Sequence, residues 1–230
     1  MAVAAACRIQ DRSRMTDYIY LDIETLPAQA DATIDYLTRS AKAPANIKDP
    51  SKIEAAKAEA ATKAVASSSF DGWLGSICCI GFAVNDNDPI TLTAVEWSEA
   101  DILRTFFRRF SIYDRPVIVG HHAAGFDVPF LTRRAIALGV ALPPAVAWPR
   151  DPKPWSDKIA DTMVMAAGSR DTISLDKLCF ALGIPGKAGF DGSMVAEAWK
   201  RGDHHIIAEY CADDVRRVRE IHKRFLNVGW

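Results

Sequence analysis

The sequence is poor in cysteine and contains no long hydrophobic run. Its five cysteines, an odd number, show no C-x-x-C spacing, which argues against a zinc site or a disulfide framework and favours a reducing compartment. No apolar stretch approaches the roughly 18 residues that a membrane span requires. Charged residues at positions 8, 11, 12 and 14 interrupt the apolar start before a signal-peptide core can form. We therefore expect a cytoplasmic protein that does not contact the membrane.

The sequence also lacks a large net charge. Its 29 acidic and 28 basic residues leave a formal charge of −1, which does not by itself indicate a nucleic-acid partner. Such a partner stays open, because a carboxylate-rich catalytic site would offset basic residues elsewhere. With 230 residues, 49% of them hydrophobic, the chain suits one globular domain. Met15 stands just before the first strand-like run, so we expect residues 1–14 to be a disordered leader and residues 15–230 to form the domain.

Three strand-like runs, followed by strands that alternate with helices, predict an α/β domain with a mixed β-sheet. The expected strands cover residues 18–24, 76–84, 90–97, 116–120 and 159–165. The expected helices cover residues 51–66, a segment from Ser98 to Phe110, and residues 128–138, 174–182, 192–199 and 203–225. Residues 28–70, rich in Ala and Lys, are typical of an inserted helical arm, with Ser51 as N-cap and Glu54 completing a capping box.

Asp22 and Glu24 lie two positions apart on the first expected strand. Side chains on a strand alternate between its faces, so both carboxylates point the same way while Ile23 points into the core. Two adjacent carboxylates repel each other, and a fold tolerates them most readily when a cation such as Mg²⁺ or Mn²⁺ neutralises them. The alternative is an acidic pair on an edge strand that faces solvent.

Two further acidic positions occur at element ends. Asp127 follows an apolar strand and a glycine-containing loop and opens the next helix. It is a candidate site residue, because α/β sites collect at the carboxyl ends of strands, or alternatively a helix cap. Tyr210 and Asp214 are four residues apart on a late helix, so both can face one site. Their alternative is an exposed acidic helix turn.

These three signals, taken in order, resemble the three exonuclease motifs of the DEDD superfamily, Tyr subclass. The resemblance is closest to stand-alone relatives of the proofreading domain of family-B DNA polymerases and covers about residues 18–226, including the segment 174–187. The His subclass places its general base five residues before the last Asp, where this chain has Glu209. The resemblance implies a ribonuclease-H-like mixed β-sheet flanked by helices, with a helical insertion at about residues 28–70, after the first strand.

By this resemblance the chain is a 3′–5′ exonuclease that hydrolyses phosphodiester bonds of nucleic acid by a two-metal-ion mechanism with Mg²⁺ or Mn²⁺. The four carboxylates Asp22, Glu24, Asp127 and Asp214 would bind the two ions. Tyr210 would position the attacking water, because a phenol with an ordinary pKa near ~10 is a poor base at neutral pH. The expected substrate is a single-stranded 3′ end, with single-stranded DNA favoured.

Four residues are expected to contact substrate. Leu26 and Phe126 would pack against the terminal nucleotide, although core packing is the alternative for Phe126. Lys187, in a Gly-flanked loop, would contact phosphate. His122 stands where the usual second motif has Asn, and it can donate a hydrogen bond to a backbone or phosphate oxygen or be a structural residue.

Other functions stay open at this point. RNA or short oligonucleotides can replace DNA as substrate, and a different phosphohydrolase would share the metal chemistry. A non-catalytic nucleic-acid-binding module on the same fold is a further alternative, disfavoured because all four carboxylates are present. The arm at residues 28–70 is where a polymerase partner or a homo-oligomer contact would be sought.

Overall fold

The computed structural model describes residues 16–153, 156–186 and 189–230. Its centre is a mixed sheet with the strand order β3-β2-β1-β4-β5. The middle strand, β1, pairs antiparallel with β2 and parallel with β4. The strands are β1 (Tyr18–Leu26), β2 (Ser76–Val84), β3 (Ile90–Thr93), β4 (Val117–Gly120) and β5 (Ile159–Asp161).

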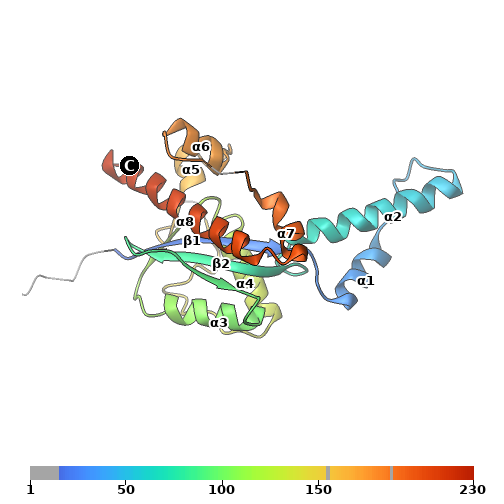
Figure 1. Cartoon of the computed structure of the whole chain (residues 1–230), viewed down its shortest axis with the longest axis horizontal. Coiled ribbons are helices and arrows are strands. Elements are labelled where there is room, and N and C mark those ends of the chain that lie inside the picture. Colours follow the sequence, from blue (N-terminus) through green and yellow to red (C-terminus); the bar gives the residue numbers. More distant parts are fainter. Residues whose placement is uncertain (1–15, 154–155, 187–188) are drawn as a thin grey trace, which may run out of the picture.

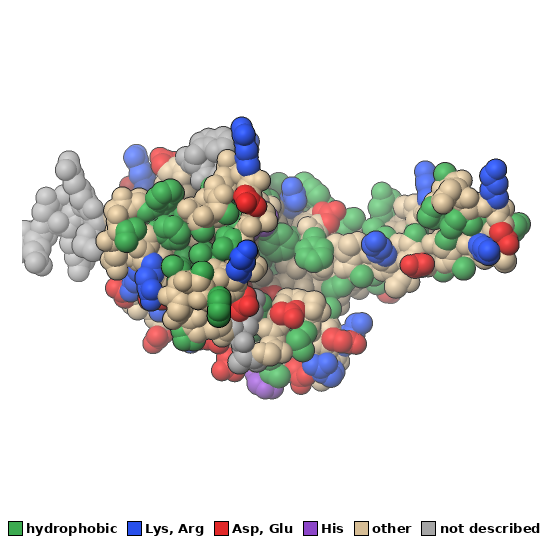
Figure 2. Space-filling model, turned by 90° about the horizontal axis from the view of Figure 1, so that it is seen from above, with side chains coloured by type: hydrophobic (Ala, Val, Ile, Leu, Met, Phe, Trp, Pro, Cys, Tyr) green, Lys and Arg blue, Asp and Glu red, His purple; other side chains and the backbone are tan. Residues whose placement is uncertain are grey.

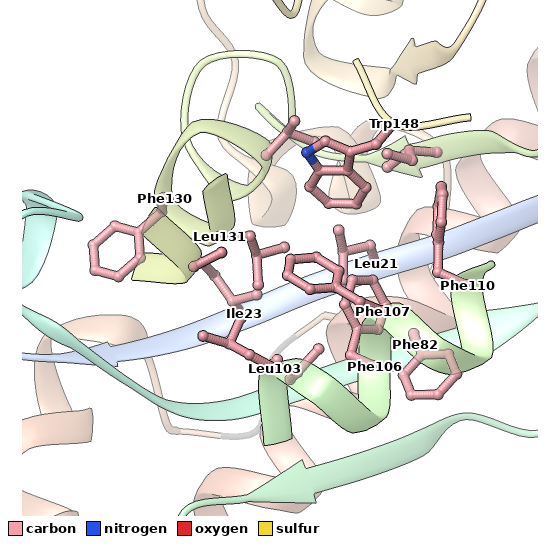
Figure 3. Packing of buried hydrophobic residues seen from close by; sticks show 14 of the residues in the cluster. Leu21, Ile23, Phe82, Leu103, Phe106, Phe107, Phe110, Phe130, Leu131 and Trp148 are labelled. Carbon is pink, nitrogen blue, oxygen red and sulfur yellow. The ribbon is translucent and has the colours of Figure 1, made fainter. Parts of the chain in front are cut away.

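Alternation along β1 divides the core into two layers. Ile19, Leu21 and Ile23 face the helices α3 (Glu99–Phe110) and α4 (Asp127–Ala137), where Trp148 packs edge-on against the aromatic rings of α3 (Figure 3). Tyr20 points to the other face, which α8 (His204–Asn227) covers (Figure 1). The sheet is thus flanked by helices on both faces, with β1 between them.

The expected helix after Ser98 is confirmed. Ser98 accepts a hydrogen bond from the Asp101 N–H and caps α3. The apolar stripe of this helix is buried and consists of Ile102, Leu103, Phe106, Phe107 and Phe110.

The inserted arm projects from the body as two helices, α1 (Asp31–Ser40) and α2 (Pro50–Ser67) (Figure 1). Lys, Arg, Asp and Glu side chains are interspersed along it (Figure 2). The helix α1 was not expected; its first turn has no side-chain cap and none of its residues is buried. The expected cap of α2 was wrong: Asp49, not Ser51, is the N-cap and accepts the Ser51 N–H, with Pro50 opening the helix.

Several other boundaries differ from expectation. The strand β3 ends at Thr93, four residues early. The strand β5 ends at Asp161, because this side chain accepts the Met163 N–H and starts a short helix, α5 (Thr162–Ala167). The helix α6 (Leu175–Ala181) is close to expectation. The helix expected at 192–199 is divided into a 3-10 turn, η2 (Gly192–Met194), and the helix α7 (Val195–Arg201). The 3-10 turn η1 (Ser68–Phe70) was not expected. The expected leader at residues 1–14 lies outside the described residues. In the described part, no helix is long and apolar enough to cross a membrane.

Candidate active site

Asp22 and Glu24 lie near the carboxyl end of β1, on the face covered by α8. Ile23 between them is buried among the α3 and α4 side chains, so the alternation inferred from sequence is confirmed. In the antiparallel pair Asp22 lies opposite Gly81 and Glu24 opposite Cys79. The register shifts just after Glu24, an irregularity of the kind that re-aims side chains beside active sites. Because β1 is the central strand of the sheet, the solvent-facing edge-strand alternative does not apply.

A glycine allows α8 to approach this pair closely. A methyl group added at Gly81 would lie 2.7 Å from the Cys211 Sγ. Cys211 is fully buried and its thiol points at the Asp22 carbonyl oxygen, 3.5 Å away. This contact fixes the turn of α8 that carries Tyr210 and Asp214, both almost fully buried. The alternative of an exposed acidic turn therefore does not hold for Asp214; Asp213, beside it, faces outward and pairs with Arg216.

A clamp formed by Asp161 holds the loop that leads to Asp127. This buried carboxylate accepts the His122 N–H at 2.9 Å and the Ala124 N–H at 3.0 Å. His122 has a φ of 71°, a left-handed conformation that Asn, Asp and His adopt more readily than other side chains. The unusual His at this position therefore suits the backbone that the loop requires.

Asp127 is the first residue of α4, and its side chain does not cap the helix. Phe126 is the N-cap residue and makes no side-chain cap hydrogen bond. The Asp127 carboxyl is buried, and this burial raises its pKa to about 7, against the lowering effect of backbone hydrogen bonds at Asp127 itself and at Ile23. The helix-cap alternative for Asp127 is thus wrong.

The charge of this cluster is not balanced by the protein around Asp22. Burial raises the pKa of Asp22 well above its ordinary value, and the neighbouring charges of Glu24, Asp214 and Asp127 raise it further. Its Oδ2 is enclosed and has no hydrogen-bond partner among the described residues. A buried carboxylate oxygen of this kind is costly unless a cation binds it. The donor set therefore fits a divalent ion that prefers oxygen ligands.

The ligand atoms that lie closest together belong to Asp22, Glu24 and Cys211, with all three within 4.8 Å of one another. The carboxylates are hard ligands and suit Mg²⁺ or Mn²⁺, whereas a thiol suits softer metals. Burial, a hydrogen bond with Cys79 and nearby negative charges raise the pKa of Cys211 well above its ordinary value. The thiol therefore suits packing, and the carboxylates are the ligand atoms of this group that suit a hard divalent ion.

Tyr210 is held at the rim of the cluster. Its ring packs edge-on against Phe190, with 5.0 Å between the ring centroids. Burial raises the pKa of its hydroxyl, and the charges of Asp214, Glu24 and Asp22 raise it further. The group is therefore a neutral phenol at physiological pH, able to orient water by hydrogen bonding.

The four residues expected at the substrate lie in different settings. Leu26 is 3% exposed and packs with Cys78 and Val195 in the core, so this structure does not present it to a nucleotide. His122 is exposed, and its ring lies against Gly125. Phe126 is half-buried and contacts Phe130 and the exposed Phe70. Lys187 lies outside the described residues.

Three residues of the site escaped the sequence analysis. Asp161 positions the loop before Asp127; an acidic residue directly after an apolar strand was the available signal. Arg217 donates to the Asp214 Oδ1 at 2.7 Å, and in the sequence it belonged to a basic run that is typical of a solvated face. Phe70 ends the inserted arm beside Phe126, and no local pattern distinguishes it. Arg134 on α4 is buried and forms a bidentate ion pair with Glu99, so it is not available to phosphate.

A family model described as a predicted 3′–5′ exonuclease related to the exonuclease domain of PolB matches residues 74–225. This range includes Asp127, Tyr210 and Asp214 and begins after β1. Among solved structures, the family B DNA polymerase from the hyperthermophilic archaeon Pyrobaculum calidifontis is similar, with a TM-score of 0.59 and 19% identity over 93% of this chain. The chain spans 25% of the length of that polymerase, and the likeness confirms the ribonuclease-H-like fold. No curated protein matches the sequence.

Proposed function

Because the chain belongs to the family of predicted 3′–5′ exonucleases related to the PolB exonuclease domain, we propose that it shortens single-stranded DNA from the 3′ end with two divalent cations. The observation that carries the metal-dependent part of this proposal is the enclosed Oδ2 of Asp22, which has no partner among the described residues. It stands in a cluster whose other carboxylates raise its pKa. A bound cation offsets that cost and would also stabilise the charge that develops during phosphodiester hydrolysis.

We assign the two ions, Mg²⁺ or Mn²⁺, to Asp22, Glu24, Asp127 and Asp214. When bound, they supply Lewis acidity that makes water a nucleophile at neutral pH and stabilises charge on the phosphate oxygens. Asp22 lies on the central strand, where the charges of the other three carboxylates act on it, and it would hold the ions together with them. Arg217 orients Asp214 through its hydrogen bond, and Asp161 sets the path of the loop before Asp127.

Tyr210 orients the attacking water in this scheme. Its raised pKa keeps the proton on the phenol, so the hydroxyl acts as a hydrogen-bonding group and does not remove the proton of the water. The water adds to phosphorus and the bond to the 3′ oxygen of the shortened strand breaks. The proton that the water loses passes to solvent, solvent protonates the 3′ oxygen, and a nucleoside 5′-monophosphate leaves.

A panel of 5′-labelled substrates tests the proposal: single-stranded DNA, duplex DNA, RNA and dinucleotides, each with Mn²⁺, Mg²⁺ or EDTA. We expect a ladder of shortened single-stranded DNA that EDTA abolishes. Faster degradation of RNA or dinucleotides would replace the assigned substrate while keeping the reaction. Metal-independent shortening, or no shortening of any substrate, would refute the proposal.

A further inference from the structure

Phe70 is an aromatic side chain that the fold leaves in solvent beside the candidate site. It is 73% exposed, although burial of a Phe side chain normally stabilises a folded protein. Its ring centroid lies 6.4 Å from that of Phe126, which directly precedes Asp127 in the chain. The two rings thus form a continuous apolar surface that begins next to a candidate metal ligand.

The turn that carries Phe70 is held firmly in place. Thr25, one residue after Glu24, donates its hydroxyl to the Ser69 carbonyl oxygen at 2.8 Å. The buried Ser68 hydroxyl accepts the Ala28 N–H at 2.8 Å. A methyl group on Gly75 would lie 2.4 Å from the Ser68 carbonyl oxygen, so the turn closes tightly on the end of β1. The exposed ring is therefore presented in a defined position relative to Glu24.

The same turn also lies directly on α4. A methyl group on Gly72 would meet the Phe130 Cα at 3.0 Å and the Arg133 Cβ at 3.1 Å. Arg133 is exposed, and within the part of the chain that the structure describes no ion pair forms with it. Arg133 thus brings a positive charge to the helix on which this turn lies. Proteins bind single-stranded nucleic acid by combining aromatic rings for the bases with positive charge for the backbone.

We propose that Phe70, which lies outside the segment 74–225 that the family model matches, stacks on the base of the nucleotide next to the 3′-terminal one. This inference rests on the proposed function. Bases in a duplex stack on their neighbours and do not offer a free face to Phe70. The recognition does not read sequence, because every base has a π-face.

The test measures binding and steady-state kinetics of the full chain with two oligonucleotides. One is an unmodified single strand, and the other has an abasic site at the second position from its 3′ end. Phe70→Ala should weaken binding of the unmodified strand about tenfold, the effect of losing one stacked base, and should raise KM much more than it lowers kcat. The unsubstituted enzyme should bind the abasic strand about tenfold more weakly than the unmodified strand. The Phe70→Ala variant should bind the two strands equally. Such non-additivity is the signature of a direct contact.

Conservative variants and a distant control sharpen the result. Phe70→Trp should bind as the unsubstituted enzyme does, because it keeps an aromatic face, whereas Phe70→Leu should behave as Phe70→Ala does. Trp230→Ala is the matched control: Trp230 is 69% exposed and follows α8, whose axis extends about 20 Å from Asp214 to Asn227. An active enzyme whose Phe70→Ala variant binds normally, or still loses affinity for the abasic strand, would overturn the inference alone. An unsubstituted enzyme that shortens no substrate would overturn the proposed function as well.

Discussion

Arg217 orients Asp214 through a 2.7 Å hydrogen bond from its Nη1 to the Asp214 Oδ1. The same guanidinium donates to the carbonyl oxygens of Pro185 and Gly186, at 3.3 and 3.1 Å. One side chain thus positions a candidate metal ligand and fastens the loop after α6 to the same turn of α8. Asp22 is in the opposite situation, because its Oδ2 has no partner among the described residues. Asp214 is therefore positioned by the protein itself, whereas Asp22 has a buried oxygen that a metal ion could bind.

Asp22→Asn should abolish activity and stabilise the metal-free protein. The neutral amide cannot replace a negatively charged carboxylate ligand, so the rate should fall by roughly a hundredfold or more. Burial and neighbouring acids raise the pKa of Asp22, and a raised pKa means that ionisation destabilises the fold as pH rises through it. At pH 8 in EDTA the variant should therefore melt above the unsubstituted protein.

Melting curves and a gel assay measure both effects of Asp22→Asn. Mn²⁺ should raise the melting temperature of the unsubstituted protein and have much less effect on the variant. Asp213→Asn is the matched control, because Asp213 is half-exposed and its short ion pair is with Arg216. It lies 3.9 Å from Arg217, whose shorter hydrogen bond to Asp214 should persist in this variant. If Asp22→Asn kept its activity, Asp22 would not be a metal ligand.

Tyr210→Phe should slow catalysis while leaving metal binding intact. The variant keeps the ring that packs against Phe190 and removes only the hydroxyl, so we expect kcat to fall by roughly 10²-fold. Asp214 keeps its hydrogen bond from Arg217. Single-turnover rates and the Mn²⁺-induced shift in melting temperature separate the two functions. Loss of that shift would make Tyr210 a structural support of the metal site.

The sequence predicted those parts of the site that depend on local periodicity. Alternation in β1 placed Asp22 and Glu24 on one face and Ile23 on the other, as the structure confirms. The inference that Tyr210 and Asp214 face one site required both to lie on one helix, and both lie on α8. Each of these arguments needs only neighbours within one element.

Contacts between segments far apart in the chain could not be predicted from the sequence. Asp161 clamps a loop 37 to 39 residues away, and nothing local distinguishes it from a helix cap, which it also is. The strand ending at Asp161 was expected to continue because Met163, Val164 and Met165 are apolar, and a short apolar run fits strand and helix equally. Phe70 lies beside Phe126 only because the arm returns to the end of β1.

Gly81→Ala should destabilise the protein by about 1–3 kcal/mol, because overpacking a filled core forces side chains and backbone to shift. The added methyl group would lie 2.7 Å from the Cys211 Sγ and 3.2 Å from its carbonyl oxygen. Urea denaturation measures the change. Gly192→Ala is the matched control, since nothing lies within 4 Å of the methyl group there. Adding Cys211→Ala to Gly81→Ala should recover part of the loss; equal stability of the two glycine variants would show that α8 does not pack on β2 as described.

His222 should make the protein less stable as the pH falls from about 6.5 to 4. Its ring is 2% exposed, its Nδ1 lies 3.2 Å from the Tyr20 hydroxyl, and burial lowers its pKa to about 4. In the unfolded chain the pKa is near ~6.5. Between these values the unfolded state binds the proton and the folded state does not, so the contribution is fully present above about 6.5 and is lost on acidification, up to about 3 kcal/mol.

The test compares urea denaturation of the unsubstituted protein and His222→Gln between pH 4 and 7.5. The raised pKa values of Asp22 and Asp127 act in the opposite direction, since their stabilisation is lost as pH rises, so neither curve alone is diagnostic. Both proteins keep these carboxylates, and both keep His121, whose pKa burial also lowers. The difference between the two free energies of unfolding therefore isolates His222 and should diminish as the pH falls, because the unsubstituted protein alone loses this contribution. His205→Gln, an exposed position on the same helix, should leave the pH dependence unchanged. A pH-independent difference for His222→Gln would mean that His222 titrates alike in the folded and unfolded chains.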